Sequence, residues 1–440
     1  MGSTLDEKAA TERLAVVSCD SHVGPRLIED LRQYCPQQHL ESYDEFTAAS
    51  GDAMGEREAA FNQVESRSTL ASEVSLARRY SNRQTAGHYD IDTRIKEMDW
   101  EGVAVEVLFH GSQNTEEFPF VGAREWLVKQ NQEDLGLAAV GMRMYNQWLA
   151  DFVAQHPDRF VGLVYPPMWD VDLATKEVEW GAANGLRGVN FPGPRTGVAA
   201  EYDDPIWEPF WDVCEEHSMT LATHAGVPTR DVFGPQSMAM TRIESAGWPC
   251  RRGMHRLVFG GVFERHPGIK LVLTEQARGW WSAAMLEMDS VYQNPSDALK
   301  RQVPKPPSEY MRTNVFLGSS FTPPTEVRQA IDEGFADNML WGRDYPHGEG
   351  TYRFPESEDD PSLTAMYLRW AFGGVDIENV RQILSGAAIR AYNLDPLVLA
   401  SLAEQFGPTV SEVIGSIDHI PPEWKWHLVD VQTGEIAQRG

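Results

Sequence analysis

The segment GMHRLVFGGVFERHPGIKLVLTE, residues 253–275, carries the pattern that decides the fold. Its first part, 253–267, spaces apolar residues as a helix does and ends at Pro267. The run IKLVLT, 269–274, is almost continuously apolar, which is typical of a parallel strand buried on both faces. Glu275 follows at once. The segment therefore predicts a helix, a buried strand and an acidic residue at the carboxyl end of that strand.

The same pattern recurs on both sides of this segment. Seven further apolar runs predict strands at 14–19, 103–109, 160–165, 187–191, 219–223, 313–318 and 339–342. Helical spacing fills the intervals at 135–157, 206–217, 279–293 and 325–334. Eight strands that alternate with helices predict the α/β class and a (β/α)8 barrel, the TIM barrel. A doubly wound open sheet is the alternative, although no G-x-G-x-x-G follows any strand.

Two regions interrupt the alternation. Residues 24–92 form a long polar insertion after the first strand, and insertions of this length on a barrel are expected over the active-site mouth. Residues 396–440 form a C-terminal extension, in which the alternation around Thr433-Gly434 predicts a hairpin within 421–438. We therefore expect a barrel domain over 14–395, including the insertion, followed by the extension.

Composition narrows the possible partners. The 440 residues include 38 Lys and Arg against 65 Asp and Glu, a formal net charge of −27. Such a charge disfavours nucleic acids and anionic membranes, so a small molecule is the expected partner. The four cysteines are scattered and form no C-x-x-C pair. With a polar amino terminus and no long apolar stretch, the chain is expected to be cytoplasmic.

Chemistry-bearing residues follow most of the predicted strands. Catalytic groups of such barrels come from the carboxyl ends of the strands. The candidates there are Asp20, His22, His110, Asn190, His224, Glu275, Ser319, Ser320, Asp344 and His347.

A metal site is the sharpest hypothesis from these ends. Asp20 and His22 stand at i and i+2 of an extended strand, so both side chains would face the same side. His224 in LATHAG and Asp344 in LWGRDYPH would add a second imidazole and a second carboxylate, a set that suits zinc or manganese. The alternative for Asp20-Ser21-His22 is a turn in which Asp20 merely caps backbone amides.

Five sequence blocks resemble the amidohydrolase-related superfamily. They are D-S-H at 20–22, T-H-A-G at 223–226, GVFERHPGIKLVLTEQARGW at 261–280, W-G-R-D-Y-P-H at 341–347 and ILSGAAIRAYNLD at 383–395. Their order is similar to the branch typified by aminocarboxymuconate-semialdehyde decarboxylase and γ-resorcylate decarboxylase. The resemblance implies one divalent metal ion per chain, Zn²⁺ or Mn²⁺, held by Asp20, His22, His224 and Asp344. Many members begin with H-x-H, where this chain has Asp20.

The chain departs from that pattern after the sixth strand. The decarboxylases of the family place a histidine there, whereas this chain has Glu275. A glutamate in an apolar mouth is expected to have a raised pKa and to act as general acid or base. A buried ion pair between Glu275 and Arg278 is the structural alternative.

The expected function is hydrolysis by a metal-activated water molecule, with Glu275 and Asp344 as catalytic residues. The substrate would be a small, aromatic or carbonyl-bearing acid, contacted by His110, Asn190, Arg278 and His347. Non-oxidative decarboxylation and hydration at the same metal are the alternatives, and a binding protein without catalysis is a further one. The long insertion, the extension and the family habit predict a homodimer.

Overall fold

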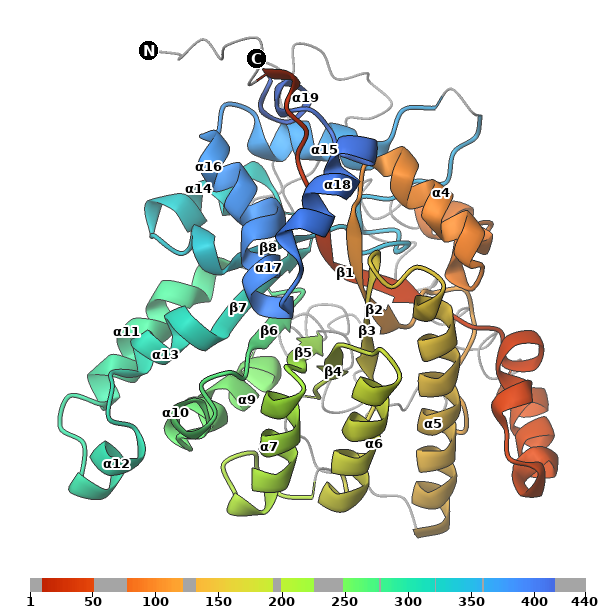
Figure 1. Ribbon diagram of the computed structural model, residues 1–440, viewed down its shortest axis with the longest axis horizontal. Helices are drawn as coiled ribbons and strands as arrows, with labels where there is room; N and C mark the ends of the chain where they lie inside the picture. The colour runs from red at the N-terminus through yellow and green to blue at the C-terminus, as the bar shows by residue number, and fades with distance from the viewer. Residues whose placement is uncertain are drawn as a thin grey trace, which may run out of the picture.

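A computed structural model of the chain describes residues 10–50, 77–121, 132–192, 199–224, 248–276, 278–320, 322–357 and 360–415. Eight parallel strands form one sheet in the order β1 to β8, with helices around it (Figure 1). The strands are β1 Val17–Val23, β2 Val105–His110, β3 Phe160–Val164, β4 Gly188–Asn190, β5 Thr220–His224, β6 Leu271–Thr274, β7 Val315–Ser320 and β8 Met339–Gly342. This is the predicted (β/α)8 barrel.

Helices connect the strands and form the outer layer. Those that follow β1 to β5 are α4 Ile91–Glu101, α5 Gln132–Ala154, α6 Val171–Ala183, α7 Glu208–Glu216, α9 Trp248–Phe259 and α10 Val262–Arg265. Those that follow β6 to β8 are α11 Trp281–Val291, α12 Asp297–Gln302, α13 Pro307–Asn314, α14 Pro324–Asp332, α15 Leu363–Phe372, α16 Ile377–Arg381, α17 Ala387–Tyr392, α18 Pro396–Phe406 and α19 Val410–Ile414. The helix predicted over 253–267 is divided, because Gly261 has a φ of 69° and ends the helical path there.

Backbone hydrogen bonds between β1 and the residues after β8 close the barrel. The amide of Asp344 donates to the carbonyl of Asp20 at 2.9 Å, and the amide of His22 donates to the carbonyl of Tyr345 at 2.6 Å. A barrel closed in this way has no free sheet edge at this seam. The seam also brings two of the sequence-predicted ligands, Asp20 and Asp344, side by side.

Two apolar cores hold the barrel. The outer core lies between the strands and the helices, and it contains residues such as Leu108, Val189 and Leu273. The inner core takes the alternate strand positions, among them Val107 and Val272. Side chains of a strand alternate between its two faces. A residue that lies two positions after an inner-core residue therefore also faces the barrel interior, nearer the carboxyl end of the strand.

The insertion and the extension pack on different parts of the barrel. Residues 27–50, red in Figure 1, lie beside α5, where the Tyr34 hydroxyl donates to Asp151 at 2.7 Å. Residues 81–88 reach the carboxyl end of the barrel, since the Asn82 side chain donates to the carbonyl of Pro346 at 2.8 Å. In the extension, α18 places Leu399 in the inner core. The hairpin expected within 421–438 lies outside the described residues.

Among the helices of the described segments, none combines the length and the apolar character that a membrane span requires.

Candidate metal centre

An irregularity in β1 aims Asp20 into the barrel. The pairing of β1 with β2 runs from Ser18–Glu106 to Ser21–Leu108, so β1 carries one extra residue between Ser18 and Ser21. Such a β-bulge shifts the alternation of side chains by one position. Cys19, which belongs to the inner core, is therefore followed by Asp20 and His22 on the same inner side. The strand extends four residues beyond the apolar run that predicted it, to Val23, because the polar side chains of Asp20 and His22 meet polar partners inside the barrel.

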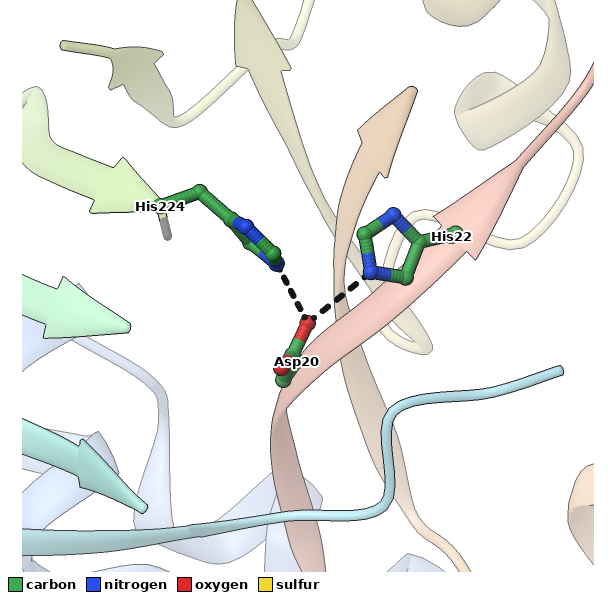
Figure 2. A group of neighbouring side chains, drawn as sticks. All are labelled: Asp20, His22 and His224. Atoms are coloured by element: carbon green, nitrogen blue, oxygen red, sulfur yellow. Dashed lines mark hydrogen bonds and ion pairs between the residues drawn. The ribbon is translucent and has the colours of Figure 1, made fainter. Parts of the chain in front are cut away.

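Asp20 is the centre of the first side-chain group. Its Oδ1 atom lies 3.2 Å from Nε2 of His22 and 3.2 Å from Nε2 of His224. Figure 2 shows both imidazoles pointing at this one carboxylate oxygen, His22 from the same strand and His224 from the end of β5. The other oxygen, Oδ2, accepts a hydrogen bond from the hydroxyl of Ser320 on β7. Three strands thus meet at one buried carboxylate.

Asp344 forms the second group and contacts the same nitrogen of His22 that Asp20 contacts. Its Oδ1 atom lies 3.1 Å from Nε2 of His22 and 2.9 Å from Nδ1 of His347. Its backbone has a φ of 50°, an uncommon conformation for a residue with a side chain, although aspartate tolerates it better than most. The rings of His22 and His347 stack with 4.0 Å between their centroids. His22 therefore joins the two groups into one cluster.

The charges of this cluster favour a cation between the two carboxylates. Burial alone would raise the pKa of the Asp20 carboxyl, but His224 and the contacts with both imidazoles hold it well below its usual range. Burial would also lower the pKa of the histidines. Contacts with Asp20 and Asp344 nevertheless raise the pKa of His22 well above its usual range, and Asp20 raises the pKa of His224 to about 9. The same attraction acts on a divalent metal ion, which binds these groups in their deprotonated forms.

The hydrogen bonds of His22 fit a metal ligand. Its Nδ1 lies 3.0 Å from the carbonyl oxygen of His110, so Nδ1 donates there and Nε2 is left to face the carboxylates. Metal-binding histidines characteristically donate their second ring nitrogen in this way. Within the described residues, His22 Nε2 and both carboxylate oxygens of Asp344 are buried without a well-aligned hydrogen bond. Oxygen and imidazole nitrogen donors with unfilled valence are what Zn²⁺ or Mn²⁺ requires.

Glu275 lies beside the cluster but outside its centre. Its Oε2 atom is 3.7 Å from Nδ1 of His224, and a quarter of its side chain is exposed. The residue has a φ of 58°, which is unusual for glutamate and directs the chain sharply after β6. Loss of hydration raises the pKa of Glu275 to about 8, although His224 acts in the opposite direction. A carboxyl group of this kind can hold a proton at neutral pH.

The residues predicted to contact the substrate are placed differently from one another. Asn190 ends β4 on the inner side of the barrel, and His347 contacts Asp344 as described above. The His110 ring instead packs edge-on against Phe118 and Tyr145, away from the two carboxylates. The side chain of Arg278 lies outside the described residues.

The sequence assigns no role to two polar residues of this region. Ser320 is a candidate only by its place at a strand end, whereas in the structure its hydroxyl donates to Asp20. Arg78, from the insertion, is buried, and its Nε and Nη1 atoms have no hydrogen-bond partner in the part of the chain that the structure describes. Asp344 and Glu349 belong to its electrostatic surroundings, while burial lowers its pKa to about 10. No periodic pattern predicts where an arginine of so long an insertion will point.

Comparisons with known proteins agree on one family. Residues 112–394 match the family model described as Amidohydrolase. A γ-resorcylate decarboxylase of Polaromonas is 25% identical over 270 residues, which cover 58% of this chain and 76% of that protein. A 2-amino-3-carboxymuconate-6-semialdehyde decarboxylase of Dictyostelium discoideum is 26% identical over 184 residues, covering 42% of this chain and 46% of the other.

Solved structures show the same fold. A 5-carboxyvanillate decarboxylase of Sphingomonas paucimobilis superposes with a TM-score of 0.55 at 21% identity, covering 87% of this chain and 100% of that one. A dihydroxybenzoic acid decarboxylase of Polaromonas, solved with manganese and the inhibitor 2-nitroresorcinol, gives a TM-score of 0.53 at 18% identity, covering 87% and 97%.

These relatives overturn the first choice of reaction. The chain was expected to be a hydrolase, whereas the relatives above are named decarboxylases, so the expectation was wrong and its decarboxylase alternative fits better. The error came from reading the missing histidine after β6 as evidence for water chemistry. Burial raises the pKa of Glu275 to about 8, and a carboxyl group of that pKa is able to act as a general acid in either reaction. The family model covers well over half of the chain, and the chain belongs to the amidohydrolase family.

Proposed function

We propose that this protein is a metal-dependent, non-oxidative decarboxylase of a small hydroxylated aromatic acid. The observation that carries the proposal is the cluster of Asp20, His22, His224 and Asp344 at the carboxyl end of the barrel, with Glu275 at its side. Support for the reaction comes from the names of the relatives, and support for a divalent metal from the donor set. The predicted homodimer stays a prediction.

Each residue of the cluster has a distinct proposed task. Asp20, His22, His224 and Asp344 would hold one Zn²⁺ or Mn²⁺. When bound, the metal supplies a Lewis acid for the substrate oxygens, which stabilises negative charge on the substrate. The bond between the ring carbon and the carboxyl carbon breaks, carbon dioxide leaves, and the electron pair stays on the ring. Glu275 donates a proton to that ring carbon and regains one from solvent.

Two further residues support an acidic, polar substrate. Arg78 offers guanidinium nitrogens that are buried and lack a partner among the described residues, and a carboxylate or phenolate oxygen would satisfy them. Asn190 is buried at the end of β4, and neither atom of its amide has a hydrogen-bond partner in the described segments. A ring hydroxyl is the kind of group that an amide of this placement recognises.

The test is turnover of a panel of ortho-hydroxylated benzoic acids, including 2,6-dihydroxybenzoate and 5-carboxyvanillate, by Mn²⁺- and Zn²⁺-loaded protein. Mass spectrometry should show products that have lost one carbon dioxide. In D₂O, each product should carry one deuterium at the vacated carbon. Gain of one water molecule would instead indicate hydrolysis or hydration.

Two controls make the result decisive. Protein treated with chelator should lose turnover and recover it when metal is restored. The His224→Ala variant should stay inactive after the same treatment. Metal-loaded protein that binds stoichiometric metal but decarboxylates no acid of the panel would contradict the proposal.

A further inference from the structure

A second group of charged residues lies directly behind the metal centre, on the other side of the barrel wall. It consists of Glu106 on β2, Arg94 on α4, Arg343 after β8 and Glu101 at the end of α4, and all four side chains are buried. Two arginines face two glutamates, so the formal charges balance. We call this group the Glu106 cluster. It shares no side chain with the ligand set described above.

The Glu106 carboxylate contacts three different elements. Oε1 accepts hydrogen bonds from the hydroxyl of Ser21 at 2.9 Å and from Nε of Arg343 at 2.6 Å. Oε2 accepts from Nε of Arg94 at 2.6 Å. One carboxylate therefore joins β1, the residues after β8 and α4.

These contacts fall on the neighbours of the metal-binding candidates. Ser21 stands between Asp20 and His22, and Arg343 immediately precedes Asp344. Arg94 also donates to the carbonyl oxygen of His22 at 2.9 Å. Neighbouring side chains of a strand point to opposite faces. A residue that is held in place on the outer face therefore fixes the position and direction of the neighbouring side chain on the inner face.

Both arginines also contact the residue after Asp344. The guanidinium carbon of Arg94 lies 3.7 Å from the ring centroid of Tyr345, and that of Arg343 lies 4.5 Å from it. The Tyr345 hydroxyl donates to Glu97 of α4. The chain on both sides of Asp344 is thus fixed to α4, which suits a residue whose φ of 50° needs support from its surroundings.

Stability alone does not account for this cluster. The cost of removing charged groups from water offsets much of their attraction, and packed apolar side chains often stabilise a protein as well. Apolar residues would, however, supply no directional contact at the bulge, where the ladder between β1 and β2 is interrupted between Ser18 and Ser21. Directional hydrogen bonds supply what the ladder lacks there.

We propose that the Glu106 cluster is a positioning device that sets the distance between the β1 ligands, Asp20 and His22, and the β8 ligand, Asp344, and thereby tunes metal affinity. The inference rests on the metal site of the proposed function. Ser21, Glu106, Arg94 and Arg343 are positioning residues that contact neither metal nor substrate.

The experiment measures Co²⁺ binding, because the visible spectrum of this ion reports its coordination geometry. Ser21→Ala removes one hydroxyl from the cluster and leaves every charge paired. We expect its Co²⁺ dissociation constant to rise about tenfold or more, with a changed spectrum, since partners of metal ligands typically contribute about 10- to 100-fold in affinity. Ser21→Thr keeps the hydroxyl and should restore wild-type binding. Glu106→Gln should have a larger effect than Ser21→Ala.

Thr220→Val is the matched control for a lost buried hydroxyl. Thr220 begins β5 and donates to the carbonyl of Ala391, far along the strand from His224. Its loss should lower thermal stability without changing Co²⁺ affinity or spectrum. If Ser21→Ala and Glu106→Gln both fold and bind Co²⁺ as the wild type does, the inference is wrong.

The two proposals fail in different ways. Wild-type protein that binds Co²⁺ but decarboxylates no substrate overturns the proposed reaction and leaves the positioning role to be decided by the variants. Wild-type protein that binds no Co²⁺ overturns both. If Glu106→Gln does not fold, Ser21→Ala and its Ser21→Thr rescue still decide the question.

Discussion

The two sides of the barrel mouth differ in whether their buried polar side chains have partners. On the β1–β8 side, Asp20 and Asp344 contact imidazoles, and the charged groups behind them are paired. On the β4–β6 side, Asn190, Thr274 and Gln276 are also buried, yet their side-chain amide or hydroxyl atoms have no partner within the described residues. Within the described residues, the carboxylates of the first side face charged or imidazole groups of the chain, whereas these three side chains of the second side face none.

This difference assigns different tasks to the two sides. A buried polar atom without a partner costs about 1–3 kcal/mol, so it persists where a ligand later supplies the partner. Paired groups instead give rigidity, which a metal site requires for its geometry. We therefore expect changes at the paired groups of the β1–β8 side to act on metal binding, and changes at Asn190, Thr274 and Gln276 to act on the substrate.

The largest effect is expected from His224→Ala, because the His224 ring, at the end of β5, reaches across the mouth to Asp20 and also faces Glu275. Its Nε2 contacts Asp20 and its Nδ1 faces Glu275. The variant should lose both stoichiometric metal and decarboxylation. Elemental analysis of protein purified without chelator, together with turnover assays, checks this. Full metal content in the variant would show that His224 is no ligand.

Glu275→Gln should come next, and it should separate the proton donor from the metal. Glutamine keeps the size of the side chain but cannot donate an acidic proton. We expect kcat to fall by about 10²- to 10⁴-fold, the usual contribution of a general acid, with metal content unchanged. Steady-state kinetics and elemental analysis on one preparation measure both. Loss of metal together with activity would place Glu275 among the ligands instead.

The sequence predicts the fold well because its signal is local and repeated. Burial on both faces makes each strand an almost continuous apolar run, and eight such runs alternate with helical segments. The barrel confirms the eight predicted strands. Strand ends were less accurate, since β1 continues through Asp20 to Val23 where polar residues face polar partners. The strand-end rule brought Asp20, His22, His224 and Asp344 together as candidates, and the structure places them in one cluster.

What the sequence could not provide is the surroundings of these groups. The β-bulge that turns Asp20 inward leaves no mark on hydrophobic periodicity. Glu106 within the apolar run VAVEVLF was a usable signal, because a carboxylate in a buried strand requires partners, but those partners are 12 and 237 residues away. The prediction of a hydrolase was wrong because the absent histidine after β6 is replaced by a glutamate whose pKa burial raises, and the sequence alone does not show that burial.

Ser320→Ala tests the surroundings of Asp20 with a smaller change. The hydroxyl of Ser320 donates to Asp20, so its loss should loosen one ligand and weaken metal binding by about tenfold, the low end for such partners. Ser319→Ala is the matched control, because the neighbouring hydroxyl donates to Glu326 on the outer side of β7. Competition with a chelator measures both affinities. Equal weakening in the two variants would indicate a general effect on β7.

Asn190→Leu should have the smallest effect on catalysis, but the sign of its effect on stability is informative. If the Asn190 amide binds a substrate hydroxyl, its removal should raise KM by about three- to tenfold and leave kcat almost unchanged. This factor corresponds to the net free energy of one hydrogen bond. The same replacement removes unpaired polar atoms from a buried position. The free protein should therefore gain stability, by about 1 kcal/mol in urea unfolding. A variant that is less stable and keeps its KM would show that Asn190 is a structural residue. The unpartnered amide at the end of β4 would then not mark a substrate-binding side of the mouth.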